Sequence, residues 1–464
     1  MLTAAPDAAP PTTARNRTSV RDRLRKYGDS ASPRIIGLDV ARAFAILGMI
    51  AAHSLNLPIM PDPLKPTTWV GIVNGNSAGL FAVLAGVSMA IMTGGRTLPS
   101  PEEMPAIRLR MLGRGAVLFV LGLALEMLNT PIAIILTSWG LLYIVVLPFV
   151  RVRRRRLAVW AVGLAVVAPA GMALIQRLFL DPYSAGLELT VAGTYPVHVW
   201  IALMLFGMIL GRSDLRARRV QLTIAGAGLA GVLVLFGLGA GISVAASSIL
   251  DSMTDSASVD GSSGSVGSGP AGAGSDQLPA DSSTSSDMPT VSPSELDPSL
   301  VCEEWGDGSV FCSPDSSSSA PGAVPDTEGS AWPEYPNALG DIMDLLWTVL
   351  AALLSPMPHA GSTVEMVIIA SVSSTVLGLC LLAGRPLRWP LLPLAALGSM
   401  PLTVYVLHVV LVFLVAGPTG AVFAVWMFAL LTGVCVGYAL LWWLFMGRGP
   451  LERLAGWASQ RAAQ

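Results

Sequence analysis

The stretch Arg34-Ile-Ile-Gly-Leu-Asp-Val-Ala-Arg-Ala-Phe-Ala-Ile-Leu-Gly-Met-Ile-Ala-Ala-His53 is the first long apolar run of the chain, interrupted only by Asp39 and Arg42. A helix of about 20 such residues spans the ~30 Å hydrocarbon core of a membrane. Arg42 and His53 are separated by eleven helical steps, about 1100° or roughly three full turns, so they face the same way with a rise of about 16 Å between them. A cation and an imidazole are costly to bury in a membrane, so the pair predicts a functional site.

Further runs of this kind predict an all-α fold, a polytopic transmembrane helical bundle. The chain is 53% hydrophobic and 12% charged, against about 25% charged residues in soluble domains. The runs are continuously apolar, whereas the strands of a membrane barrel alternate. We expect about ten spans, at 36–55, 70–92, 109–128, 131–150, 157–177, 196–211, 220–248, 364–383, 391–415 and 419–446.

Clusters of Lys and Arg predict the topology, because cytoplasmic connections of membrane proteins are enriched in them. The clusters fall at every second connection, which predicts a multi-pass plasma-membrane protein with both termini in the cytoplasm. Topology explains these charges, so nucleic-acid binding is not expected. The clusters lie in the tail from Arg15 to Lys26 and around Arg96–Arg114, Arg151–Arg156 and Arg212–Arg219.

Residues 338–355 form one more apolar stretch, which contains Asp341 and Asp344. Counting this stretch as a span would put the later basic residues, such as Arg385 and Arg388, on the outside. We therefore interpret it as a re-entrant or interfacial helix at the outer face. A bundle of eleven spans is the alternative.

Composition divides the chain into segments. Residues 251–335 hold fifteen acidic residues and no Lys or Arg, among many Ser, Gly and Pro, which predicts a disordered extracytoplasmic loop. Cys302 and Cys312 in this loop either form a disulfide, which is permitted outside the cytoplasm, or remain two free thiols. The predicted organisation is a disordered basic tail (1–34), spans 1–7 (35–250), the acidic loop (251–335), the interfacial helix with spans 8–10 (336–447) and a cytoplasmic tail (448–464).

The predicted topology places all four histidines in the outer half of the membrane. His408 lies three residues after Tyr405 on one helix face, which indicates either a polar pocket or a satisfied buried pair. His359 is either a loop residue or a site residue. His198, near Tyr195 and Trp200, is best explained as a residue of the interfacial aromatic belt.

Two further polar residues are candidates for the same outer region. Glu126, near the outer end of the third span, either orients a histidine or reaches water. Asn76 begins the second span and either lines a pocket mouth or belongs to a glycine-rich packing face with Gly79 and Gly86. Three imidazoles could hold zinc, but no local ligand spacing supports this, so no metal is expected.

The motif Leu38-Asp39-Val-Ala-Arg42, followed after ten intervening residues by His53, resembles the first-helix signature of membrane-bound acyltransferases. The wider chain resembles their YeiB-like branch, and it is more distantly similar to the heparan-alpha-glucosaminide N-acetyltransferase family. The resemblance covers about 36–250 and 338–455. Similar stretches are Leu80-Phe-Ala-Val-Leu-Ala-Gly-Val-Ser88, Pro358-His-Ala-Gly-Ser362, Pro401-Leu-Thr-Val-Tyr-Val-Leu-His408 and Gly449-Pro-Leu-Glu452.

The resemblance implies that an acyl group, in particular acetyl, moves from cytosolic acyl-CoA to a hydroxyl or amine of a glycan, lipid or metabolite at the outer face. Acyl-CoA is then a substrate, and no bound cofactor is expected. His53 would act as base or acyl carrier, and Arg42 would contact the donor, unless it is a structural lock with Asp39. Arg108, Arg110 and Arg114 would hold the donor phosphates, whereas Asp39, Asn76, Glu126, His359, Tyr405 and His408 would line the substrate site.

Two other function classes remain open. A transporter or exporter of a small polar or lipid-linked solute would use the buried polar groups as a pathway. A membrane sensor or scaffold would instead capture cations or partners with the acidic loop. The oligomeric state is not predicted.

Overall fold

A computed structural model describes residues 19–29, 34–178, 193–259, 300–304, 310–314 and 342–464. The chain divides into two compact units, residues 1–247 with 339–464 and residues 248–338. Each unit is considered by itself. The predicted disorder of the acidic loop concerns residues that lie largely outside the described ranges.

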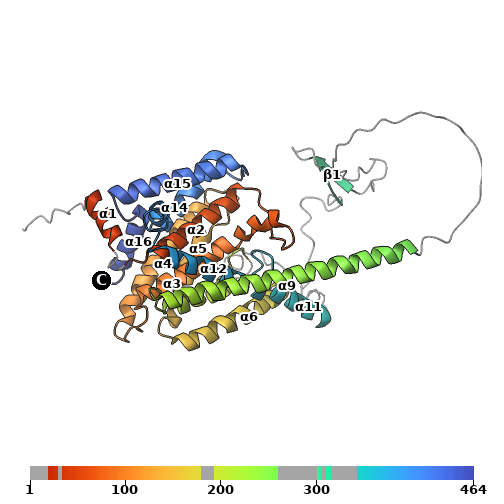
Figure 1. Cartoon of the computed structure of the whole chain (residues 1–464), viewed down its shortest axis with the longest axis horizontal. Helices are drawn as coiled ribbons and strands as arrows, with labels where there is room; N and C mark the ends of the chain where they lie inside the picture. The colour runs from red at the N-terminus through yellow and green to blue at the C-terminus, as the bar shows by residue number, and fades with distance from the viewer. Residues whose placement is uncertain (1–18, 30–33, 179–192, 260–299, 305–309, 315–341) are drawn as a thin grey trace, which may run out of the picture. The chain divides into compact units, whose positions relative to one another are not determined.

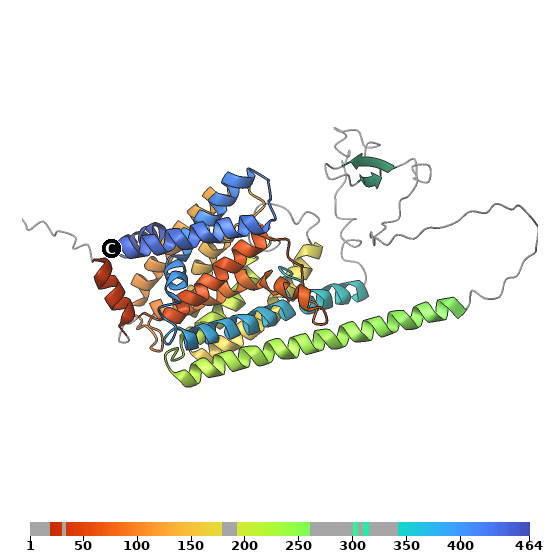
Figure 2. The same cartoon turned by 45° about the horizontal axis from the view of Figure 1, so that its top comes forward.

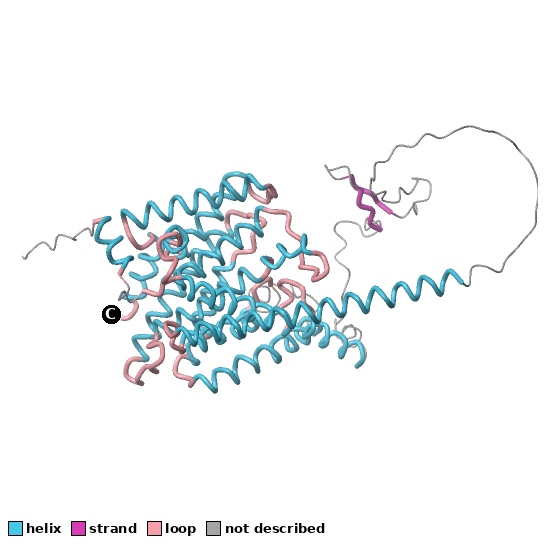
Figure 3. Tube along the Cα trace, in the orientation of Figure 1, coloured by secondary structure: helices cyan, strands magenta, loops and turns pink. Residues whose placement is uncertain are grey.

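The first unit is a helical bundle (Figure 1), in agreement with the predicted fold class. Figure 3 shows that most of its described chain is helix, with short loops between the helices. Its helices are α1 (Val20–Gly28), α2 (Ile36–Ser54), η1 (Pro66–Val73), α3 (Asn76–Met92), α4 (Met104–Glu126), α5 (Ile135–Val145), η2 (Leu147–Phe149), α6 (Arg154–Leu178), α8 (Val197–Gly211), α9 (Arg218–Val259, which continues beyond the unit), α11 (Ile342–Leu354), α12 (Thr363–Ala383), α13 (Leu392–Gly398), α14 (Pro401–Ala416), α15 (Val425–Phe445) and α16 (Pro450–Arg461).

Five of the described helices are long and apolar enough to cross a membrane: α2, α6, α9, α12 and α15. Two bent pairs, η1 with α3 (41°) and α13 with α14 (87°), raise the number to seven if each pair is one span. The bundle is therefore a membrane fold, and the expected count of ten spans stays a prediction. Helix α11 has 13 residues, about 20 Å of rise, which is short for a span.

Helix α2 lies in the centre of the bundle, where it packs against α3, α12, α13 and α15 (Figure 2). Contact with α13 is close because Gly398 has no side chain: a Cβ there would overlap the Asp39 carbonyl oxygen. Gly86 and Gly207 allow the same close approach between α3 and α8. The predicted packing role of the glycine face of α3 is therefore confirmed at Gly86.

Long-range contacts gather the basic connections at one end of the bundle, which we call the basic end. Arg96 forms an ion pair with Asp214 (3.2 Å), and Arg212 Nη2 donates to the carbonyl oxygen of Val150 (2.5 Å). Tyr27 of α1 donates to the Arg388 carbonyl oxygen (2.6 Å), and burial raises the pKa of this tyrosine to about 12. Connections that are far apart in sequence therefore present their charges together.

Three further segments contain regular secondary structure. Part of the tail expected to be disordered forms α1, which begins with a capping box between Ser19 and Asp22 and buries Tyr27 between Trp389 and Trp443. The C-terminal tail forms α16. In the second unit, β1 (Leu300–Glu304) and β2 (Val310–Pro314) pair antiparallel, with Cys302 opposite Cys312.

Candidate functional site

The polar face of α2 begins with a charge network around Asp39, which is only 4% exposed. Asp39 Oδ1 accepts from Arg42 Nη1 (2.8 Å), and its Oδ2 accepts from Arg34 Nε (2.6 Å). Arg42 also donates through Nη2 to Ser88 Oγ of α3 (2.8 Å). The predicted contact between Asp39 and Arg42 is therefore present, and it fixes the guanidinium in place.

Arg42 lines a cavity of about 270 Å³, which we call the arginine cavity. Arg114 of α4 lies in the same wall and contacts the Met92 sulfur (3.5 Å). Arg108 and Arg110 are exposed and are not part of this lining. Of the three arginines predicted to hold the donor, the structure thus brings one to Arg42.

The opposite wall of the arginine cavity is the start of α14, just after the sharp break that follows α13. Glu452 of α16 accepts the backbone N–H groups of Leu402 (2.8 Å) and Thr403 (3.1 Å) and the Thr403 hydroxyl (2.6 Å). A carboxylate is favourable at a helix N-terminus because it pairs with backbone N–H groups that lack helical partners. Glu452 therefore holds α14 in position.

At the other end of α2, three imidazoles gather into what we call the histidine cluster: His53, His359 and His408. The rings of His53 and His408 stack, with centroids 5.6 Å apart and 9° between their planes. His53 and His359 are close enough to interact electrostatically. His198 lies on α8. Three of the four histidines, from α2, the loop before α12 and α14, thus meet at one place.

The histidine cluster carries unused hydrogen-bonding capacity. Nδ1 of His53 and Nδ1 of His359 are buried, with no hydrogen-bond partner among the described residues. A buried polar atom without a partner costs about 1–3 kcal/mol, so its retention indicates a role other than stability. The described part of the chain contains no group of three His, Cys, Asp or Glu side chains placed to hold a metal.

Aromatic side chains surround the cluster. Tyr405 packs edge-on against His408 (5.0 Å), and its hydroxyl oxygen accepts the Ile135 N–H (3.2 Å) at the start of α5. Tyr195 packs edge-on against both His359 (5.5 Å) and Trp200 (5.2 Å). Tyr405 therefore connects α14 to the start of α5. Tyr195 contacts the histidine cluster through His359.

Glu365 holds the loop before α12 that carries His359. Its carboxylate was not identified from the sequence. This side chain is 5% exposed and accepts the backbone N–H groups of His359 (2.6 Å) and Gly361 (2.7 Å). His359 has a left-handed backbone, with φ of 63°, and burial lowers the pKa of its imidazole. Ser362 caps the helix by accepting the Glu365 N–H (2.9 Å), so Ser362-x-x-Glu365 was the available sequence signal.

Two candidates remain, Glu126 and Asn76. Glu126 is exposed, and its described hydrogen-bond partner is Thr137 (2.5 Å) rather than a histidine. Asn76 donates to the Ile72 carbonyl oxygen (2.9 Å), while its Oδ1 is buried and has no partner among the described residues. Of these two residues, Asn76 is the one whose buried Oδ1 has no hydrogen-bond partner among the described residues.

Residues 34–240 match the family model for the catalytic domain of heparan-alpha-glucosaminide N-acetyltransferase. The match is consistent with the transmembrane acyltransferase superfamily. No curated protein and no solved structure matches the chain significantly. The narrower YeiB-like assignment stays a prediction.

The acyltransferase match covers α2 to α8 and most of the apolar part of α9. Arg42 and His53, the ends of the polar face of α2, both lie inside it, as does Arg114. His359 and His408 lie outside it and reach the same place only through the fold. The histidine cluster therefore combines residues from within the matched region with residues from beyond it.

Proposed function

We propose that this protein is a membrane acyltransferase that uses cytosolic acyl-CoA, in particular acetyl-CoA, and acylates an acceptor at the opposite face of the membrane. The observation that carries the proposal is the arrangement along α2: the arginine cavity near its start and the histidine cluster near its end. The family match supports membrane acetyl transfer; the donor, the acceptor and the direction are proposals.

The arginine cavity suits the phosphate-bearing part of the donor. Arg42 and Arg114 supply fixed positive charge, and the guanidinium fork matches phosphate oxygens. The pantetheine arm of CoA separates the phosphates from the thioester. An acyl-CoA held at the arginines would therefore direct its acyl group along α2 toward His53, about 16 Å away.

The histidine cluster supplies the base for the transfer. A neutral His53 would take the proton of the acceptor hydroxyl or amine. The acceptor oxygen or nitrogen would then bond to the acyl carbon, the C–S bond would break, and CoA thiolate would leave and be protonated. His359 and His408 of the same cluster would orient the acceptor.

The topology belongs to the same proposal. The basic end would face the cytoplasm, as expected from the distribution of positive charge, and the protein would lie in the plasma membrane with both termini inside. The histidine cluster would then face the outer side, where a glycan, lipid or metabolite accepts the acyl group.

The test is transfer of labelled acetyl from acetyl-CoA by the full-length protein in sealed vesicles. We expect His53→Ala to lower the rate by about 10²–10⁴-fold, the usual contribution of a general base. His198→Ala is the matched control because it removes an imidazole from α8 rather than from α2. Full transfer by the His53→Ala protein would refute the proposal.

A transporter is the second candidate, and one observation favours it: the 87° break between α13 and α14. Transporters build substrate sites at such broken helices. The two functions differ in their products, because an exporter moves its solute unchanged. Efflux that survives His53→Ala, without any acylated product, would favour the transporter.

A further inference from the structure

A second cavity, of about 390 Å³, lies between α9, α12 and the segment that contains η1. We call it the α9–α12 cavity. Its lining shares no residue with that of the arginine cavity. The volume falls within the range of roughly 300–1,000 Å³ that is typical of small-molecule sites. The proposed function has not used it.

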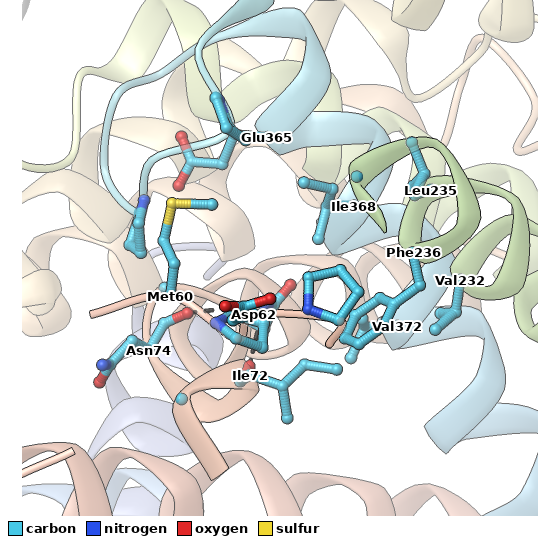
Figure 4. A pocket seen from close by; sticks show the side chains of 18 of the residues that line it. Met60, Asp62, Ile72, Asn74, Val232, Leu235, Phe236, Glu365, Ile368 and Val372 are labelled. Atoms are coloured by element: carbon cyan, nitrogen blue, oxygen red, sulfur yellow. Dashed lines mark hydrogen bonds between the residues drawn. The ribbon is translucent and has the colours of Figure 1, made fainter. Parts of the chain in front are cut away.

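The α9–α12 cavity has a polar end and an apolar end (Figure 4). Glu365 and Asn74 lie at one side of the view, and Val232, Phe236 and Val372 lie at the other. On α12, the distance from Glu365 to Val372 is seven residues, a rise of about 10 Å. The cavity is therefore elongated along the helix axes. An alkyl chain that lies parallel to the membrane lipids would fit this direction.

The polar end offers hydrogen-bond acceptors. Asn76 Oδ1 is buried without a partner among the described residues, whereas its amide nitrogen already donates to Ile72. Asn74 likewise donates its amide to the Pro58 carbonyl oxygen (2.8 Å). Asp62, in the middle of the view, lines the cavity too, and its carboxylate pairs with Lys65 (3.6 Å). A ligand head at the polar end must therefore supply donors, and a carboxylate head, which has none to supply, would be disfavoured.

This polar end adjoins the histidine cluster. Pro358 lines the cavity, and the next residue is His359. A Cβ on Gly75, at the start of α3, would meet Pro358 at 3.1 Å. Glu365 lines the cavity and also accepts the His359 N–H. A head group bound here would lie beside the imidazoles.

We propose that the α9–α12 cavity binds a single-chain amphiphile, with its apolar chain between α9 and α12 and a hydroxyl or amine head at Asn76. We further propose that this amphiphile is the acyl acceptor, and this second part rests on the proposed function. Its head would give the proton to His53 and form the new bond to the acyl carbon as the thioester C–S bond breaks.

Two glycines of α9 provide a matched pair of variants. Gly239 lines the cavity, and a Cβ there would lie in ordinary contact with Pro63, at 3.4 Å. Gly237 is exposed, and a Cβ there would meet nothing within 4 Å. Gly239→Leu should fill the cavity, while Gly237→Leu places the same side chain on the outer surface of the same helix. Val372→Phe is a second filling variant, from α12.

The experiment uses the full-length protein in lipid nanodiscs and a long-chain alcohol with a diazirine in mid-chain. We expect photolabelling to map to peptides with Leu235, Phe236 and Ile368. Labelling should fall about tenfold in Gly239→Leu, the effect of losing roughly two buried methylene groups, and should persist in Gly237→Leu. Melting temperatures confirm folding of each variant, and Val372→Phe replaces Gly239→Leu if the latter unfolds.

Equal labelling of the two glycine variants, or labels confined to the exposed face of α9, would overturn the proposal. The fatty acid with the same chain should label less than the alcohol, and equal labelling would contradict the proposed head group. Labelling needs no acyl transfer and should be unchanged in His53→Ala. The binding site for the amphiphile is therefore tested independently of the proposed function, because only its role as acyl acceptor requires transfer.

Discussion

The imidazole rings of His53 and His408 are parallel, with 9° between their planes and 5.6 Å between their centroids. His53 lies in the last turn of α2, and His408 lies in the middle of α14. The side chain of His408 is fully buried. The stacked pair therefore joins two helices that are far apart in the sequence.

Replacing His408 separates a catalytic role from a structural one. His408→Phe keeps a flat ring against His53 and removes two buried polar atoms from the interior, so stability should change little. Acyl transfer should fall, because the imidazole nitrogens are lost. Tyr405→Phe is the control on the same helix: it removes the oxygen that accepts the Ile135 N–H and should cost about 1 kcal/mol. A His408→Phe protein that melts earlier but transfers normally would contradict this.

Arg114 and Arg110 give a test of the donor site. They are one turn apart on α4, but Arg114 lines the arginine cavity whereas Arg110 is exposed. Arg114→Gln should raise the KM for acyl-CoA about tenfold, because hydrogen bonds to charged groups contribute about 1.5–3 kcal/mol. Arg110→Gln should leave the KM nearly unchanged at moderate salt. Equal effects would show that the cavity does not hold the donor.

Glu365 should organise the loop that carries His359. Glu365→Gln keeps the shape but replaces one acceptor oxygen with a donor, which would face the N–H groups of His359 and Gly361. We expect faster hydrogen exchange of these two amides and a lower transfer rate, with little change in the exchange of α2. Asp344→Asn, at the exposed start of α11, is the control carboxylate. Unchanged exchange at His359 in the Glu365→Gln protein would remove Glu365 from this role.

The buried position of His359 predicts a pH dependence of stability. Burial lowers the pKa of its imidazole below the ordinary value, which is about 6.5. The unfolded chain therefore takes up this proton first as the pH falls, so stability is constant above about pH 6.5 and decreases below it. Melting temperatures between pH 8 and 5 should show a smaller decrease in His359→Gln than in the unmodified protein. The same decrease in both would exclude His359 as its source.

The two strands of the second unit test the assignment of the outer face. Cys302 and Cys312 are directly opposite each other in the antiparallel register, and Cα atoms of opposite residues are about 4.5–5.5 Å apart, a separation that a disulfide can bridge. We expect a disulfide in protein purified without reductant, found by peptide mapping before and after reduction. Cys380 and Cys435, both buried in helices, should remain thiols. Free Cys302 and Cys312 in such protein would place this segment in a reducing compartment.

The sequence was most informative where a contact is local. Asp39 and Arg42 are three residues apart on one helix, so helical spacing alone predicts their ion pair. Tyr405 and His408 are predicted for the same reason. The placement of His359 and His408 near His53 followed more loosely, from the charge bias of the connections, which orients the helices but not their packing.

Contacts that depend on tertiary packing were not predicted. Glu365 resembles an ordinary capping residue in the sequence, and only the left-handed backbone at His359 shows why its carboxylate faces the preceding loop. Arg114 and Arg110 have the same side chain at neighbouring positions, and only the fold decides which of them lines a cavity. Tyr195 was taken for a belt residue because its contact with His359 joins segments far apart in sequence.

Glu452 has a consequence for the biosynthesis of the protein. Helix α16 follows the last apolar helix, yet its carboxylate holds the start of α14 and lines the arginine cavity. During translation, α2, α3 and α4 are inserted long before this residue leaves the ribosome. The cavity can be completed only when the last helix has been made, so a nascent chain that is released early would insert its spans without gaining a finished donor site.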